Sequence, residues 1–96
     1  MKHKRLKDPA AYYQAQKLHC EHCGWRAYGG AHHIVTRGAG GPDHSYNLIQ
    51  LCADCHTKAH AGQIDKRDLW NIVARREGVE AQELIDAVNR LRGRDV

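Results

Sequence analysis

Two pairs of cysteines, each with two residues between its members, most constrain what this 96-residue chain can fold into. They are Cys20/Cys23 and Cys52/Cys55, and 28 residues separate the pairs. A two-residue gap lets one tight turn present two sulfur atoms to one ion, and tetrahedral zinc takes four thiolates at about 2.3 Å. The alternatives are two disulfides, which need an oxidising compartment, or buried free thiols. The pattern therefore predicts a structural zinc ion bound by all four cysteines.

The apolar composition gives a reason for a metal in the core. Leu, Ile and Val together make up 17 of the 96 residues and Phe is absent. That share lies below the roughly 20% at which chains tend toward disorder, although a small net charge argues against full disorder. Short chains also bury a modest fraction of their surface, so they often depend on a metal or on disulfides. We therefore expect one domain that needs its zinc to fold.

No apolar run in the sequence is long enough to form a membrane-spanning helix. The longest uninterrupted apolar run covers residues 10–13, whereas a transmembrane helix needs about 20 apolar residues. The apolar core of a signal peptide is missing as well. The sequence therefore predicts a cytoplasmic protein without a membrane partner.

The positive charge is concentrated at the N-terminus. Residues 1–17 carry five Lys and Arg residues against Asp8 alone, whereas residues 18–61 and 62–96 are each balanced. Basic arms neutralise phosphates and release counterions, so nucleic acid is the first partner to consider. The alternative is a solvated terminus or a remnant of an expression vector. The candidate phosphate contacts of the arm are Lys2, Lys4, Arg5 and Lys7.

Local signals predict four helices and a pair of short strands. Asp8 suits the N-cap and Pro9 the first position of a helix over residues 8–18. Two β-type runs, residues 31–35 and 48–51, flank a loop rich in glycine. A third segment, residues 53–61, is predicted to form a helix that stops before Gly62. Two amphipathic helices are expected over residues 66–77 and 80–92, separated by Gly78.

The two C-terminal helices are expected to form a hairpin. Its apolar side chains would pack on the rest of the chain or on a protein partner. The spacing also resembles a helix-turn-helix, but Glu80 and Glu83 lie at the end that would meet base edges, where carboxylates repel phosphates. Packing is therefore favoured over DNA reading. The side chains expected in the hairpin are Trp70, Val73, Leu84 and Val88.

The histidines predict a second metal ion. His56 and His60 are four residues apart and share one face of the predicted helix, whereas Cys55 lies about 100° around the helix from His56 and serves the other ion. His32 and His33 are adjacent in a predicted strand and point to opposite faces. One of them can join His56 and His60 as a ligand while the other stays free as a base. The alternative is that these are incidental surface histidines.

Residues 20–60 resemble the HNH nuclease family, whose core is the ββα-metal finger. Thr36 stands where the family commonly has Pro, and this departure concerns the rigidity of the loop. The family landmarks occur in order: Cys20 and Cys23, His32-His33 followed by Ile34-Val35, Arg37 and the glycine loop, Asn47-Leu48, Cys52 and Cys55-His56, and His60.

The resemblance implies an α+β fold, namely a small HNH or treble-clef-like ββα-metal finger stapled by a zinc ion on four cysteines, with flanking helices. Together with the charge and the helical patterns of the flanks, which lie outside the resemblance, it predicts three parts: a basic arm and short helix at 1–17, the HNH core at 18–62 and a helical hairpin at 63–96. It also implies roles for individual residues, with a backbone carbonyl holding the second ring nitrogen of the base. These roles are general base for His33, ligands of the catalytic ion for His32, His56 and His60, a tie between loop and strand for Asn47, and a phosphate contact for Arg37.

The implied activity is metal-dependent hydrolysis of DNA phosphodiester bonds. His33 would deprotonate the attacking water, and the ion would stabilise charge on the phosphate and on the leaving 3′ oxygen. Imidazole ligands suit Zn, Ni, Co or Mn better than Mg. The alternative is a non-catalytic zinc-binding adaptor for DNA or protein with the same fold. The complete set of His33, Asn47 and His56 favours the nuclease.

Overall fold

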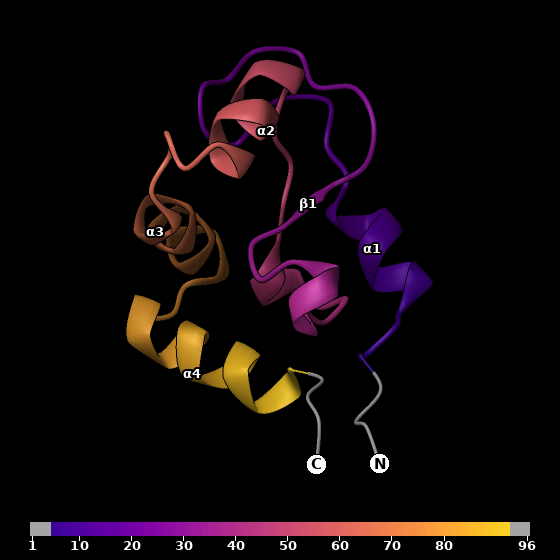
Figure 1. Ribbon diagram of the computed structural model, residues 1–96, viewed down its shortest axis with the longest axis vertical. Helices are drawn as coiled ribbons and strands as arrows, with labels where there is room; N and C mark the ends of the chain where they lie inside the picture. Colours follow the sequence, from indigo (N-terminus) through magenta and orange to yellow (C-terminus); the bar gives the residue numbers. More distant parts are fainter. Residues whose placement is uncertain (1–4, 93–96) are drawn as a thin grey trace.

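The computed structural model describes residues 5–92, and β1 pairs with β2 at the centre of the described part (Figure 1). The pairing is antiparallel, with His32 opposite Ile49 and His33 opposite Leu48. In chain order the elements are α1 (Pro9–Ala15), β1 (His32–His33), the 3₁₀ turns η1 (Arg37–Ala39) and η2 (Ser45–Asn47), β2 (Leu48–Ile49), α2 (Ala53–His60), α3 (Lys66–Glu77) and α4 (Ala81–Leu91).

The helices begin and end where capping residues predict. The side chain of Asp8 accepts a hydrogen bond from the backbone N–H of Ala11 at 3.2 Å, and Pro9 occupies the first turn of α1. Gly78 ends α3 with a φ of +72°, a left-handed conformation that suits glycine. All four predicted helices are present, with small differences at their ends.

Both strands are shorter than the predicted β-type runs, and other hydrogen bonds replace the ladder at each end. Beyond His33, the backbone N–H of Ile34 donates to the carbonyl of Asn47 at 2.9 Å. The next N–H, that of Val35, donates to the side-chain oxygen of Asn47 at 2.8 Å. At the other end, the backbone N–H of Gln50 donates to the Glu21 carboxylate at 2.7 Å and its carbonyl accepts the N–H of Glu21 at 2.8 Å. Regular pairing is therefore limited to two residues of each strand.

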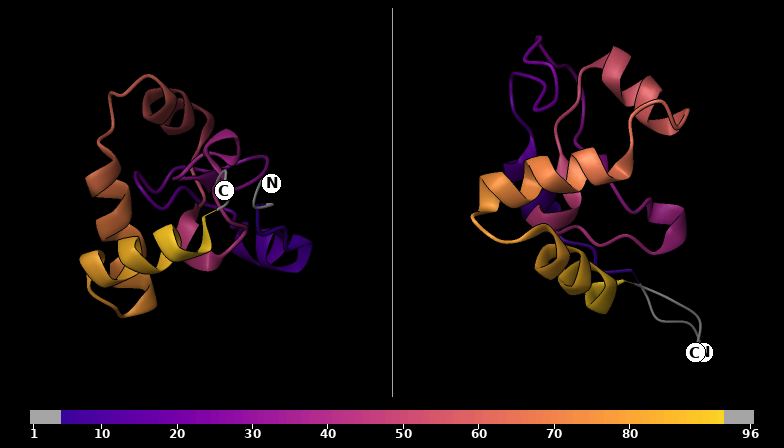
Figure 2. Two further views of the ribbon diagram at one scale, coloured as in Figure 1. Left: turned by 60° about the horizontal axis from the view of Figure 1, so that its bottom comes forward. Right: turned by 90° about the vertical axis from the view of Figure 1, so that its left-hand side faces the viewer.

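The C-terminal hairpin completes the core of the finger. Helices α3 and α4 pack against each other and against η2, and α3 also contacts β2 (Figure 2). Val73, Leu84 and Val88 are fully buried in one cluster with Ile34 and Ile49 of the finger. Of the two expectations for the hairpin, packing on its own chain is the one observed.

Arg76 links α3 to the first cysteine pair and to β2. Its guanidinium donates to the carboxylate of Glu21 at 2.8 and 3.1 Å, to the carbonyl of Leu48 at 3.1 Å and to that of Ser45 at 2.6 Å. Its Nε atom also donates to Glu77 at 2.9 Å. One cation thus joins segments that are as many as 55 residues apart.

The predicted α+β class is confirmed: two antiparallel strands and the following helix α2 form a ββα unit. The cysteine cluster joins this unit, through Cys52 and Cys55, to Cys20 and Cys23, which precede β1. None of the helices between residues 5 and 92 is long and apolar enough to cross a membrane. The division into three parts at residues 17 and 62 stays a prediction.

Candidate metal centres and active site

The four cysteines come together at one point between the first knuckle and the start of α2. Their sulfur atoms all lie within 4.8 Å of one another, and all four are free thiols, so the disulfide alternative is not observed. The Sγ atoms of Cys23 and Cys52 are 3.6 Å apart. Tetrahedral ligands at about 2.3 Å from zinc lie about 3.8 Å from each other, so the four sulfurs fit such an ion.

The two cysteine pairs share one local geometry. The backbone N–H of Cys23 points to Sγ of Cys20 at 3.5 Å, and the N–H of Cys55 points to Sγ of Cys52 at the same distance. Burial alone would raise the pKa of Cys20, but backbone N–H donors, led by that of Cys23, outweigh it and lower the pKa to about 7. Cys20, Cys52 and Cys55 are buried, and Cys23 is exposed.

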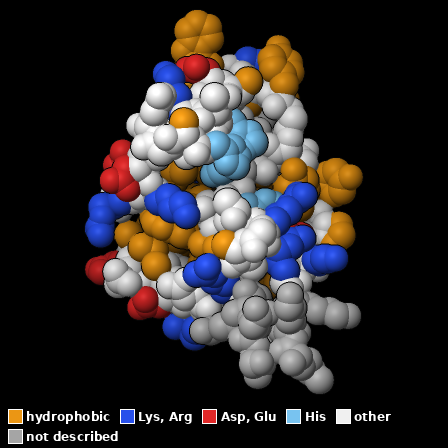
Figure 3. All heavy atoms as spheres, viewed as in Figure 1, with side chains coloured by type: hydrophobic (Ala, Val, Ile, Leu, Met, Phe, Trp, Pro, Cys, Tyr) orange, Lys and Arg blue, Asp and Glu red, His pale blue; other side chains and the backbone are white. Residues whose placement is uncertain are grey.

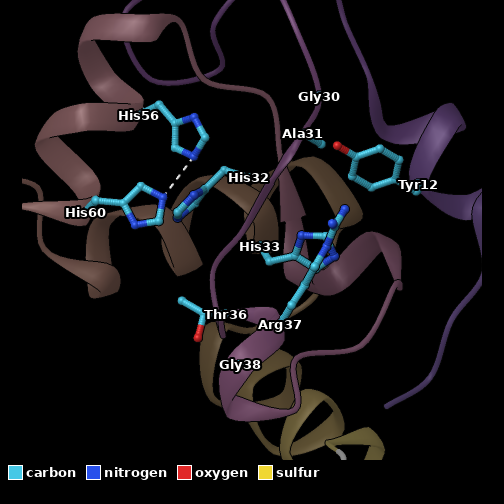
Figure 4. A pocket seen from close by; sticks show the side chains of 10 residues that line it. All are labelled: Tyr12, Gly30, Ala31, His32, His33, Thr36, Arg37, Gly38, His56 and His60. Carbon is cyan, nitrogen blue, oxygen red and sulfur yellow. Dashed lines mark hydrogen bonds between the residues drawn. The ribbon is translucent and has the colours of Figure 1, made fainter. Parts of the chain in front are cut away.

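Three histidines form a second ligand set. The ring nitrogens of His32, His56 and His60 lie within 4.8 Å of one another, and the Nε2 atoms of His56 and His60 are 3.0 Å apart. Burial, together with the two neighbouring imidazoles, lowers the pKa of His32 to about 4, and burial also lowers the pKa of His56. Neutral imidazoles keep the lone pair that a divalent cation needs. Figure 4 shows His32 of β1 directed at the pair on α2.

His33 lies apart from this histidine set, next to Asp43. Its Nε2 atom is 2.7 Å from Oδ1 of Asp43, and both side chains are buried. Burial lowers the pKa of His33, and the hydrogen bond to Asp43 offsets part of that effect. We expected a backbone carbonyl at this ring nitrogen; the partner that the structure provides is a carboxylate.

Asp43 is itself held by two further donors. Its carboxylate binds the guanidinium of Arg5 and accepts the backbone N–H of Asp8 at 3.0 Å. Burial alone would raise the pKa of Asp43, but the hydrogen bonds from His33, Arg5 and Asp8 outweigh it and lower the pKa to about 2. Asp43 is therefore ionised at neutral pH and can accept a hydrogen bond from the protonated Nε2 of His33.

Asn47 closes the loop between the two strands. Its side-chain amide donates to the carbonyls of Val35 at 3.0 Å and Pro42 at 3.1 Å, in addition to the bond from the N–H of Val35. Gly41 makes this closure feasible, because a Cβ atom there would lie 1.7 Å from the carbonyl oxygen of Val35. The amide is completely buried, so the two ends of the loop are held in one position.

This arrangement of ligands and loop agrees with the comparison with known families. The family model of the HNH endonucleases matches residues 20–62. This segment, a little under half of the chain, is similar to an HNH domain. Neither the curated proteins nor the solved structures contain a match to the chain. The resemblance predicted from the sequence is thereby confirmed, and an HNH domain indicates a nuclease or nucleic-acid-binding function.

The matched segment lines most of a cleft of about 440 Å³. His32, His56 and His60 line one part of it, and His33 and Arg37 line another. On the face of the molecule that Figure 3 shows, histidine side chains reach the surface near the middle, with Lys and Arg side chains nearby. A wall of the cleft comes from Tyr12 of α1, which lies outside the matched residues.

The loop beside the HNH histidines keeps its turn despite the departure from the family pattern at Thr36. The Thr36 hydroxyl accepts the backbone N–H of Ala39 at 3.3 Å and caps η1. Arg37 follows at the first position of η1 and is exposed at the cleft. Its guanidinium is therefore accessible to a bound phosphate.

The predicted phosphate contacts of the arm are not all free. Lys2 and Lys4 lie outside the described residues, and Lys7 is exposed. Arg5 instead pairs with Asp43 and donates to the carbonyl of Gly41 at 3.2 Å. Part of the arm thus belongs to the surroundings of His33.

Sequence reasoning missed two residues next to His33, namely Asp43 and Tyr12. Asp43 follows the glycine loop, but nothing in its local pattern indicates that its carboxylate turns back toward β1. Tyr12 belongs to a predicted helix outside the HNH landmarks. A contact between segments depends on packing, and the sequence offered no signal for either one.

Proposed function

We propose that the chain is a metal-dependent endonuclease that hydrolyses DNA phosphodiester bonds, with His33 as its general base. One observation carries the proposal. A histidine held by a carboxylate and a separate set of three histidines line the same cleft, and adjacent residues of β1 contribute one member to each. A base and a cation site on either side of a scissile phosphate are what metal-assisted hydrolysis requires.

Asp43 would set the tautomer of the base. A carboxylate at Nε2 favours the tautomer that carries its proton there, so Nδ1 keeps its lone pair. His33 would then take the proton of the attacking water at Nδ1. Asn47 would support this geometry by fixing both ends of the loop that carries Arg37 and Asp43.

The remaining residues would bind ions and DNA. His32, His56 and His60 would hold the catalytic ion; imidazole ligands suit Zn, Ni, Co or Mn better than Mg. Such an ion supplies Lewis-acid stabilisation of the charge on the phosphate and the leaving 3′ oxygen. The four cysteines would hold a structural zinc. Arg37 would contact a phosphate, and the lysines of the arm would add electrostatic binding.

A plasmid-nicking assay tests the proposal. Wild-type protein with added Zn, Ni, Co, Mn or Mg should convert supercoiled DNA to the open circle, and His33→Ala should lower the rate about 10²–10⁴-fold, the usual contribution of a positioned base. His19→Ala, an exposed histidine away from the cleft, is the matched control and should nick at the wild-type rate. DNA binding without nicking in any metal would instead favour the non-catalytic adaptor.

A further inference from the structure

We infer that Tyr12 is a positioning residue for His33, contributed by a helix outside the matched HNH segment. This inference rests on the proposed role of His33 as general base. Tyr12 belongs to α1 and lines the same cleft as both histidine groups. The family match begins only at residue 20, so α1 is an addition to the matched finger.

The ring of Tyr12 stacks on the ring of His33. Their centroids are 5.7 Å apart and their planes differ by 18°. The guanidinium carbon of Arg37 lies 5.2 Å from the centroid of the same Tyr12 ring. Figure 4 shows Tyr12 on the α1 side of the cleft, with His33 and Arg37 both next to it. One aromatic side chain thus contacts the proposed base and the proposed phosphate contact.

Tyr12 is held by packing against its neighbours, and its helix is held by a hydrogen bond at its start. It packs against a small buried cluster formed by Ala15, Ala31 and Leu48. The start of α1 is tied to Asp43, which accepts the backbone N–H of Asp8 at 3.0 Å. Because Asp43 also binds His33, the helix and the base share one anchor.

Gly30 leaves room for the Tyr12 hydroxyl. A Cβ atom at residue 30 would lie 1.7 Å from the hydroxyl oxygen of Tyr12 and 2.9 Å from its Cζ atom. Gly30 has no left-handed φ, so alanine is compatible with the backbone there. The only obstacle to a side chain is Tyr12 itself. Gly30→Ala therefore moves Tyr12 without altering its chemistry.

The two contacts of His33 fix different degrees of freedom. The hydrogen bond to Asp43 fixes the direction in which Nε2 points, but the ring can still rotate about that direction. The stack on Tyr12 limits this rotation because it holds the plane of the imidazole. The Nδ1 lone pair is then aimed at one position in the cleft, and small errors in such alignment are costly to rate.

Two substitutions of Tyr12 separate the ring from the hydroxyl. Under single-turnover conditions, Tyr12→Leu should lower the maximal nicking rate about 10-fold, with a smaller change in the DNA concentration at half-maximal rate. Tyr12→Phe keeps the ring and should retain most of the rate. Tyr13→Leu is the matched control, since Tyr13 is exposed and does not line the cleft. Equal rates for Tyr12→Leu and wild type would overturn the inference.

Gly30→Ala gives a second test of the inference, and this test does not depend on whether Tyr12→Leu folds. Alone it should lower the rate about as much as Tyr12→Leu. Combined with Tyr12→Phe it should be clearly less harmful, because the hydroxyl oxygen at 1.7 Å is gone and only Cζ, at 2.9 Å, must still shift. If Gly30→Ala is equally harmful with and without Tyr12→Phe, the effect does not pass through Tyr12 and the inference is wrong.

A spectroscopic measurement keeps the inference testable even if the protein proves not to cut DNA. The carbon-bound ring protons of His33, assigned by comparison with His33→Ala, should move downfield in Tyr12→Leu because the shielding by the aromatic face is lost. Tyr12→Phe and Tyr13→Leu should leave them in place. Unchanged His33 signals in a folded Tyr12→Leu would contradict the stack, whereas absent nicking with the expected shifts would contradict only the proposed nuclease function.

Discussion

The carboxylate of Asp43 lies 2.7 Å from Nε2 of His33, across the loop that joins the two strands. This contact makes His33 a histidine with a defined acceptor, clearly different from the three that converge on one another. Arg5 and the backbone of Asp8 complete the surroundings of the carboxylate.

Asp43→Asn should slow DNA nicking about 10–100-fold, within the range by which supporting groups around a functional histidine affect activity. The amide no longer favours the tautomer with the proton on Nε2. Since the pKa of Asp43 is about 2, the wild-type carboxylate is ionised throughout the assay range, and it offsets part of the lowering that burial imposes on the pKa of His33. His33 should therefore stay neutral to lower pH in the variant, so the ratio of the two rates should narrow as the pH falls. Asp54→Asn, an exposed aspartate on α2, is the control. An unaltered rate in Asp43→Asn would show that the carboxylate has no role in orienting the base.

His32→Ala and His33→Ala should each lower the nicking rate, but for different reasons. His32→Ala removes a member of the three-histidine set, so the second ion should bind more weakly and added metal should restore part of the activity. His33→Ala should leave this ion bound and stay slow at saturating metal. Calorimetric metal titration together with nicking rates tests this, and loss of the ion in His33→Ala alone would reverse the assignment.

Cys23→Ser should unfold the protein. Cys23 is exposed, so the substitution removes little buried surface and its effect reports mainly on the ion. In small metal-dependent domains, much of the folding free energy is the binding free energy of the ion. His60→Ala, which weakens only the other ligand set, should keep native far-UV circular dichroism. A cooperative melt in Cys23→Ser would show that the apolar core suffices.

Arg76→Met should lower the free energy of unfolding by about 2–3 kcal/mol, because it removes the guanidinium that pairs with Glu21 and that donates to two backbone carbonyls. Methionine keeps most of the aliphatic stem, so lost packing contributes little. Arg75→Met, at the exposed neighbouring position, should change stability by less than about 0.5 kcal/mol. Denaturant titration of both variants measures the difference; equal effects would mean that the Arg76 network is not stabilising.

Deleting residues 1–4 should weaken the salt dependence of DNA binding. The deletion removes Lys2 and Lys4, and the slope of log affinity against log salt should fall by about 2 if both contact phosphates. Arg5→Gln should act differently, lowering the nicking rate more than the slope, because Arg5 is paired with Asp43. An unchanged slope after the deletion would mean that these two lysines do not contact DNA.

The amino-acid sequence by itself determined the parts of this protein that depend on short-range spacing. The C-x-x-C pairs, the i, i+4 histidines of α2 and the capping residues Asp8 and Gly78 act within one turn of chain. Helical and strand periodicity then fixes which side chains share a face. For the same reason the fold class, the approximate helix limits and the two clusters of cysteine and histidine side chains could be predicted.

Tertiary structure alone decided which residues surround His33. Tyr12 is 21 positions before it and Asp43 is 10 after it, and they reach it from a flanking helix and from a closed loop. Arg76 meets Glu21 across 55 residues. Such contacts depend on how α1, the Asn47-closed loop and α3 pack together, and no local periodicity encodes the relative placement of separate segments. The chemistry of the ligands could therefore be predicted from sequence, but the surroundings of the base could not.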